Sequence, residues 1–336
     1  MKILITGGAG FVGARLARTL LSRDTLAGRR IERLVLTDQY PAPDDLRQDS
    51  RVEVRTGALL TQCEALREER FDGLFHLASA VSGECETDFD LGMRSNLDST
   101  RALLESLRYQ VTHGAAPTRL VFSSSIAVFG PDASVPLPAV CADDTLPAPQ
   151  TSYGTQKLMC EQLIADCTRK GFLDGRSARL MTVTVRPGRP NGAASSFFSG
   201  IIREPLAGQE AVLPVSTDVA HPVSSPRRTV EGLIAVYEAS RASLGGRLAL
   251  NLPALNVTVQ QMLDALERVA GPRVRARVRP ERDERIAAIV ANWPKATSGE
   301  RARALGLEPE QRFDDVIRQY IEDCRAQNPA ALKGMD

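Results

Sequence analysis

Apolar residues along the first half of the chain follow two alternating patterns. Short runs rich in Val, Ile, Leu and Phe predict buried strands at residues 2–6, 33–37, 52–55, 73–78, 120–124 and 182–186. Apolar residues at helical spacing predict helices at residues 13–23, 96–109 and 153–170. Strands that alternate with helices in this way are typical of a parallel sheet built from strand–helix–strand units.

The pattern changes after residue 186, where Gly, Ser and Pro become frequent. Later elements are still expected, as helices at residues 197–206, 229–240, 257–270 and 313–327 and as a strand at 247–252 that returns to the sheet. A run with five prolines between residues 131 and 149 predicts a loop. We therefore predict two lobes, one of residues 1–186 and 229–252 and a smaller, discontinuous α+β lobe of residues 187–228 and 253–336.

Composition narrows the possible functions. The formal net charge is only +1, which argues against binding to nucleic acid or to an acidic membrane surface. Six cysteines without a C-x-x-C pair favour reduced thiols, and three scattered histidines do not predict a metal site. The apolar run at the N-terminus is too short for a signal peptide or a membrane span, so a cytoplasmic protein is expected.

A glycine-rich loop follows the first predicted strand. It runs from Gly7 to Gly13 and contains Gly10, Phe11 and Val12. Glycines between a first strand and its helix let backbone N–H groups approach a pyrophosphate at the helix N-terminus. Asp38 ends the second strand, where a carboxylate accepts hydrogen bonds from the adenosine ribose and repels a 2′-phosphate. The sequence therefore predicts a Rossmann-type, doubly wound parallel sheet that binds NAD in preference to NADP.

A candidate catalytic group lies at the start of the helix at residues 153–170. Tyr153 and Lys157 are four residues apart and share one helical face, so the ammonium group can lie near the phenol. A neighbouring ammonium and a positive nicotinamide ring both favour the phenolate and make it a usable base. The strand at 120–124 runs into three serines, whose hydroxyls can hold a substrate oxygen. Together these residues predict coupled proton and hydride transfer.

These motifs, together with His76–Ser79, Asn96 and Phe122–Gly130, make the chain resemble an extended short-chain dehydrogenase/reductase. The resemblance implies that Ser125 is the catalytic serine, beside Tyr153 and Lys157. It also implies cofactor contacts from Leu77, Ala78, Asn96 and Ser123, from Tyr153 and Lys157, and from Pro187 and Gly188 beside the nicotinamide. Lys157 is expected to hold the nicotinamide ribose. The chain departs from the family pattern at Gly57-Ala58-Leu59, where an Asp that contacts adenine is often found. Adenine is therefore expected to be held by backbone and apolar contacts, with Leu59 among them.

Residues after the sixth predicted strand bear on the substrate. In sugar-nucleotide epimerases the position of Arg189 typically holds an Asn, whereas an arginine can bind a carboxylate bidentately. Arg203, Arg227 and Arg228 are further cations of the same lobe.

The runs 80–83, 88–96, 186–206 and 224–228 resemble the branch of the family that oxidises the C2 hydroxyl of a four-carbon sugar acid with NAD. That resemblance implies substrate contacts from Ser82, Ser125, Tyr153, Arg189 and Asn191.

Two other functions remain open from the sequence. A UDP-sugar 4-epimerase would use the same triad, keep its NAD and produce no net NADH. A regulator that senses NAD would need no catalytic tyrosine, and the intact Tyr153/Lys157 pair argues against it. A homodimer is expected only by analogy with the fold group.

Overall fold

A computed structural model describes residues 1–188 and 193–335. In these ranges the main feature is a seven-stranded sheet in the order β12-β8-β7-β6-β1-β4-β5. Every neighbouring pair in this sheet is parallel. The strands are β1 (Lys2–Thr6), β4 (Arg33–Asp38), β5 (Val52–Thr56), β6 (Gly73–His76), β7 (Arg119–Ser125), β8 (Asp174–Leu180) and β12 (Leu250–Asn251). The predicted α/β fold with a doubly wound sheet is confirmed.

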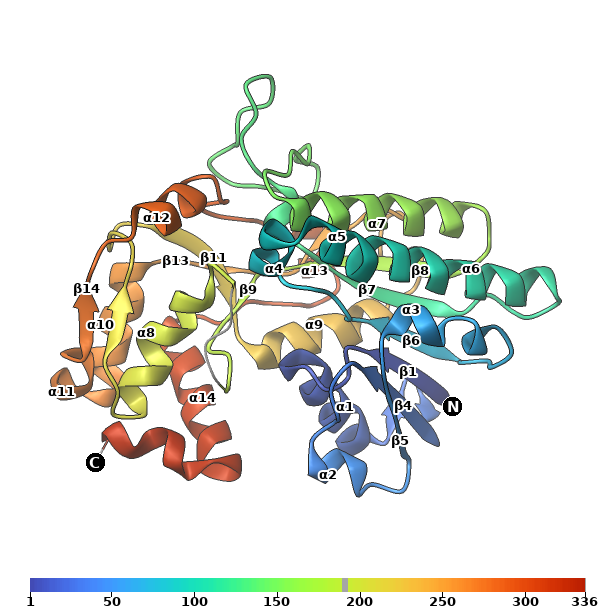
Figure 1. The fold of residues 1–336 in the computed structure, drawn as a ribbon, viewed down its shortest axis with the longest axis horizontal. Coiled ribbons are helices and arrows are strands. Elements are labelled where there is room, and N and C mark those ends of the chain that lie inside the picture. The colour runs from blue at the N-terminus through green and yellow to red at the C-terminus, as the bar shows by residue number, and fades with distance from the viewer. Residues whose placement is uncertain (189–192, 336) are drawn as a thin grey trace.

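Helices cover both faces of the sheet (Figure 1). One face carries α1 (Phe11–Arg23) and α9 (Pro226–Glu238), and the other carries α6 (Ser99–Thr112) and α7 (Ser152–Arg169). On one side of β1 lie β4 and then β5, and on the other side lie β6, β7, β8 and β12. The strand order therefore reverses between β1 and β6, and in open α/β sheets ligands bind at the carboxyl ends of strands at such a point.

The prediction of the sixth sheet strand was wrong. Residues 182–183 form β9 (Thr182–Val183), which pairs with β11 (Ala220–Ser224) in a separate three-stranded sheet completed by β13 (Leu255–Thr258). The sheet strand is β8, whose sequence DGRSARL is polar. Its two arginines are nevertheless buried, because each finds a carboxylate partner in the interior.

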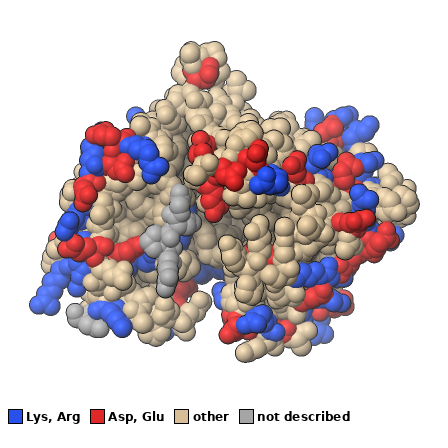
Figure 2. All heavy atoms as spheres, viewed as in Figure 1, with Lys and Arg blue, Asp and Glu red and all other residues tan. Residues whose placement is uncertain are grey.

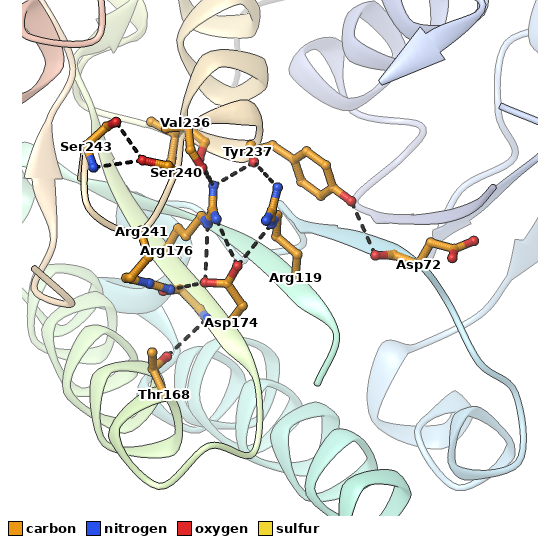
Figure 3. A network of polar contacts seen from close by, with 12 residues as sticks. Asp72, Arg119, Thr168, Asp174, Arg176, Val236, Tyr237, Ser240, Arg241 and Ser243 are labelled. Carbon is orange, nitrogen blue, oxygen red and sulfur yellow. Dashed lines mark hydrogen bonds and ion pairs between the residues drawn. The ribbon is translucent and has the colours of Figure 1, made fainter. Parts of the chain in front are cut away.

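Arg176 of β8 belongs to a polar network at the far end of α9 (Figure 3). Asp174 lies between the guanidinium groups of Arg119, Arg176 and Arg241. Arg176 Nη1 also donates to the carbonyl oxygens of Val236, Tyr237 and Ala239, at 2.6–2.7 Å. These carbonyls end a helix and lack partners within it, so Arg176 joins β8 to α9 and makes a polar strand stable inside the protein.

The second group of elements lies beside the sheet, at the left of Figure 1. Its hydrophobic core contains Phe198, Leu263, Ile317 and other apolar residues between Val185 and Cys324. The elements are α8 (Ser196–Leu206), β10 (Ala211–Leu213), α10 (Val259–Ala270), α11 (Pro272–Arg275), β14 (Val278–Pro280), α12 (Glu284–Ala291), α14 (Phe313–Gln327) and a terminal 3-10 helix (Pro329–Met335). The short helix α13 (Glu300–Arg303) instead packs against β12 of the main sheet. The predicted helices at 197–206, 257–270 and 313–327 correspond to α8, α10 and α14. The lobe boundaries given above stay a prediction.

Short elements occupy the connections. They are β2 (Thr25–Leu26), β3 (Arg29–Arg30), α2 (Asp44–Arg47), α3 (Leu59–Gln62), α4 (Ser82–Thr87), α5 (Phe89–Gly92), a π-helical turn (Met93–Asp98) and two 3-10 turns (Ala65–Arg67 and Ile126–Val128). The proline-rich segment at 131–149 is a loop, as predicted. Within the ranges described above, no helix combines the length and apolar character needed to cross a membrane. The same part of the chain contains no group of three His, Cys, Asp or Glu side chains that could hold a metal ion.

Two buried histidines make stability depend on pH. Burial lowers the pKa of His76 and of His221 from 6.5 to about 3. Below pH 6.5 the unfolded chain therefore takes up protons that the folded chain does not. As a result, the free energy of unfolding decreases as the pH is lowered. We expect each histidine to contribute about 1.4 kcal/mol per pH unit in this window.

Urea unfolding at pH values between 6.5 and 4 measures this slope. His221→Gln should reduce this slope by about 1.4 kcal/mol per pH unit, because one buried histidine is removed. A slope in His221→Gln equal to that of the wild type would show that His221 is not the titrating group.

Candidate active site

A cleft of about 2010 Å³ opens at the carboxyl ends of β1 and β6 and reaches the second group of elements. Its wall includes the glycine-rich loop, the end of β7, the start of α7 and part of α12. Acidic and basic side chains are interspersed on the face drawn in Figure 2. Because the cleft opens at the carboxyl ends of β1 and β6, it lies where the strand order reverses, as expected for a nucleotide site on this fold.

The glycine-rich loop is packed too closely for larger residues. A Cβ atom on Gly13 would lie 2.1 Å from the carbonyl oxygen of Gly7. Gly10 precedes α1, and no side chain caps this helix. The first N–H groups of α1 thus remain available, and α1 has no acidic residue in its first turn. This arrangement suits the diphosphate of a dinucleotide.

Asp38 lies at the end of β4, next to the loop. Its half-buried carboxylate accepts hydrogen bonds from Ala9 N at 3.0 Å and Tyr40 N at 3.1 Å. Both oxygens are thus oriented by the backbone while the residue still lines the cleft. A carboxylate held in this way can accept hydrogen bonds from ribose hydroxyls.

The structure brings most of the other predicted cofactor residues to the cleft wall. Those that line it are Gly7, Gly10, Phe11, Val12, Gly13, Leu59, Leu77, Ala78 and Ser123. Asn96 is instead buried behind the wall, where its side chain accepts from Ala80 N and donates to Gln156. Pro187 and Gly188 are exposed and are not part of the described wall. Cofactor contacts from all of these residues, those that line the cleft included, stay a prediction.

The predicted substrate residues divide in the same way. Ser82, Ser125 and Tyr153 line the cleft. Arg189 and Asn191 lie outside the described residues. Of the other cations in this part of the sequence, Arg227 and Arg228 pair with Glu322 and Glu231, and Arg203 pairs with Glu204.

Tyr153 reaches the cleft from the first turn of α7. Thr151 caps this helix and accepts a hydrogen bond from Gly154 N at 3.0 Å. Gly154 is needed because a Cβ atom there would lie 2.1 Å from the carbonyl oxygen of Ala127, in the turn that follows Ser125. The close approach of α7 to this turn places the tyrosine beside the serine that ends β7.

Lys157 lies one turn further along α7 and is buried. Its ammonium group donates to the carbonyl oxygen of Ser123 at 2.9 Å and lies 5.5 Å from the centroid of the Tyr153 ring. Burial lowers the pKa of Lys157 to about 8. Lys157 therefore lies close to Tyr153, as predicted, with its ammonium group over the tyrosine ring.

The electrostatic environment of Tyr153 includes two residues that sequence reasoning missed. Burial raises the pKa of the phenol to about 12, while hydrogen bonding to Ser125 and Ser79 and the charge of Arg186 lower that pKa. Ser79 follows β6 and Arg186 follows β9, and both line the cleft. Both residues follow the end of a strand, and this position could have identified them from the sequence.

A buried ion pair connects α7 with β8 and also contacts β7. Arg179 of β8 binds Glu161 of α7 bidentately, at 2.9 and 2.8 Å, and Ser124 of β7 donates to the same carboxylate. The Arg179 guanidinium also lies 4.9 Å from the Phe129 ring centroid. This group joins the helix that carries Tyr153 to the strand that ends in Ser125.

Comparison with known proteins places this site in a family. The model of the NAD dependent epimerase/dehydratase family matches residues 3–239. The chain belongs to this family. The predicted resemblance to extended short-chain dehydrogenases/reductases and the predicted cofactor, NAD, are thereby confirmed.

Individual relatives are similar over nearly the whole chain. A D-erythronate dehydrogenase of Cupriavidus necator is 49% identical, with 96% of this chain and 99% of the relative covered. A D-erythronate dehydrogenase of Haemophilus influenzae is 43% identical with the same coverage. The crystal structure of a nucleoside-diphosphate-sugar epimerase from Agrobacterium tumefaciens superposes with a TM-score of 0.91 at 42% identity, with 97% of this chain and 95% of that chain covered.

Proposed function

We propose that this protein is an NAD-dependent dehydrogenase that oxidises the C2 hydroxyl of D-erythronate to 2-oxo-tetronate. The observation that carries the proposal is the convergence of Tyr153, Ser125 and Lys157 in one cleft with the dinucleotide loop. The near full-length similarity to two D-erythronate dehydrogenases supports the choice of substrate.

The chain's own residues supply positioning and proton transfer. Ser125 orients the substrate hydroxyl, and Tyr153 accepts its proton as the general base. Gly7–Gly13 would hold the diphosphate of NAD, Asp38 the adenosine ribose, and Lys157 the nicotinamide ribose. Bound NAD supplies the hydride acceptor and a positive ring that favours the phenolate.

A second candidate is an epimerase that acts on a nucleotide sugar. It is favoured by the similarity to the Agrobacterium tumefaciens structure, and it would use the same three residues. The two functions differ in redox balance, because an epimerase regains its hydride and releases no NADH.

An assay that follows both NADH absorbance and sugar identity separates the two functions. The protein is incubated with NAD and a panel of short sugar acids and UDP-sugars. We expect NADH only with short sugar acids, and D-erythronate as the best substrate of the panel. Interconversion of UDP-sugars without NADH would contradict the proposal and support the epimerase, and silence with both classes would support a sensing role.

Cofactor choice is expected to depend on Asp38. Asp38→Asn removes the charge that repels a 2′-phosphate and weakens the ribose contacts, so the preference for NAD over NADP should fall by about tenfold or more. Steady-state kinetics with both cofactors measure this ratio. Asp44→Asn, an exposed acid paired with Arg47, is the control and should leave the ratio unchanged. An unchanged ratio in Asp38→Asn would remove Asp38 from the cofactor site.

A further inference from the structure

Arg186 is the unusual cation of the cleft. Four basic residues line the described part of the wall, namely Arg94, Lys157, Arg186 and Arg285. Arg94 and Arg285 are exposed, and Lys157 already donates to Ser123. Arg186 is half-buried, and its charge acts on the phenol of Tyr153. Arg186 is thus the cation best placed to meet a group attached to the reacting carbon.

Protein contacts hold the Arg186 side chain without using all of its donors. Its Nε donates to the carbonyl oxygen of Val183 and its Nη2 to Ser195 Oγ, each at 3.0 Å. Its backbone N–H donates to Ser199 Oγ at 3.0 Å, and its guanidinium carbon lies 5.8 Å from the Phe11 ring centroid. Side chain and backbone are therefore fixed before any ligand binds.

The remaining donors of Arg186 have no acid to bind. Within residues 1–188 and 193–335, no carboxylate lies within ion-pair distance of this guanidinium, and Glu204 of the same cleft pairs with Arg203. A guanidinium has five N–H donors, of which the contacts above use two. Among contacts with the residues that the structure describes, the two hydrogens on Nη1 and one on Nη2 remain unused. They form the fork that binds a carboxylate bidentately.

The chemistry of the proposed substrate favours a cation close to Tyr153. In a 2-hydroxy acid the carboxylate carbon is bonded directly to the carbon that loses hydride. A carboxylate must therefore lie within a few ångströms of the Tyr153 phenol when the hydroxyl is bound to it. We infer that Arg186 binds the substrate carboxylate through its free fork and thereby selects short 2-hydroxy acids over neutral sugars. This inference rests on the proposed function, because it assigns the acid group of the same substrate.

The test compares a charged substrate with its neutral counterpart. D-Erythronate and its amide share the carbon skeleton and the C2 hydroxyl, but only the acid carries a charge. In Arg186→Gln the KM for D-erythronate should rise about 100-fold, and the Kd for NAD should stay unchanged. The kcat/KM for the amide should fall far less than that for the acid, because the amide loses only the effect of Arg186 on the pKa of Tyr153. Arg186→Lys should recover only part of the loss, because a lysine lacks the planar fork. Arg228→Gln, which removes one exposed charge outside the cleft, is the control.

Three outcomes would overturn the inference. An equal loss of kcat/KM for acid and amide would mean that Arg186 acts through Tyr153. A weaker Kd for NAD in step with the higher KM would make Arg186 a cofactor contact. Unchanged kinetics in Arg186→Gln, with a raised KM in Arg189→Gln, would assign the carboxylate to Arg189.

Calorimetric binding of D-erythronate to the NADH complex separates this inference from the proposed function. If the protein binds the acid in an Arg186-dependent manner but oxidises no short sugar acid, the proposed function fails and the inference stands. If the wild-type complex neither binds nor oxidises the acid, both are overturned.

Discussion

Tyr153→Phe should lower kcat for D-erythronate oxidation by about 10²- to 10⁴-fold, since the variant has no group to accept the hydroxyl proton. The ring remains, so its contact with Lys157 and the packing at the start of α7 should persist. The Kd for NAD is therefore expected to stay within about twofold of the wild type, because neither the loop nor Asp38 is altered. Stopped-flow or steady-state NADH formation measures the loss.

Tyr109→Phe provides a matched control on a different helix. Tyr109 packs on His113 near the end of α6, and its hydroxyl is not part of the cleft wall. Its kcat should equal that of the wild type.

The wild-type rate of oxidation should also rise with pH below the pKa of the Tyr153 phenol, because only the phenolate accepts a proton. A Tyr153→Phe variant that keeps more than about a tenth of the activity would rule out the tyrosine as the base.

Glu161→Gln should lower the free energy of unfolding by about 3–5 kcal/mol, the largest effect expected on stability. The change leaves Arg179 buried without a counter-charge and weakens the acceptor of Ser124. Both side chains of the Glu161–Arg179 pair are at most 5% exposed, so water does not replace the lost contact. Urea unfolding at pH 7 measures the loss.

Asp166→Asn tests the same chemistry on the surface of the same helix. Asp166 pairs with Arg169, and both are exposed, so its removal should cost less than about 0.5 kcal/mol. The double variant Glu161→Leu/Arg179→Met should recover much of the stability lost in Glu161→Gln, since it removes both buried charges. Equal unfolding midpoints for Glu161→Gln and Asp166→Asn would show that the buried pair contributes little.

The sequence predicted those parts of the fold whose local pattern agrees with their environment. The strand before Gly7, the helix after it and the helix that carries Tyr153 all combine apolar spacing with a distinctive turn or cap. Strand β8 was missed because its buried positions include Arg176 and Arg179. Their burial depends on Asp174, Glu161 and the end of α9, which come together only in the folded chain.

The site was predictable to a similar extent. The glycine loop, Asp38 and the Tyr153/Lys157 pair were predicted from spacing together with their place in the strand and helix pattern, since each uses residues within one turn or one strand end. Ser79 and Arg186 were missed because they reach Tyr153 from two separate strand ends. Asn96 had a family motif in its favour, yet the structure uses its side chain to join the segment after β6 to α7.

Transfer of the C2 hydrogen tests the central proposal most directly. D-Erythronate carrying deuterium at C2 is incubated with the protein and NAD, and the products are analysed by mass spectrometry and NMR. We predict one deuterium in each reduced dinucleotide formed, an equal amount of 2-oxo-tetronate, and transfer at least about 100-fold slower in Tyr153→Phe. Deuterium that stays in the acid, or a substrate returned with only its stereochemistry changed, would contradict the account.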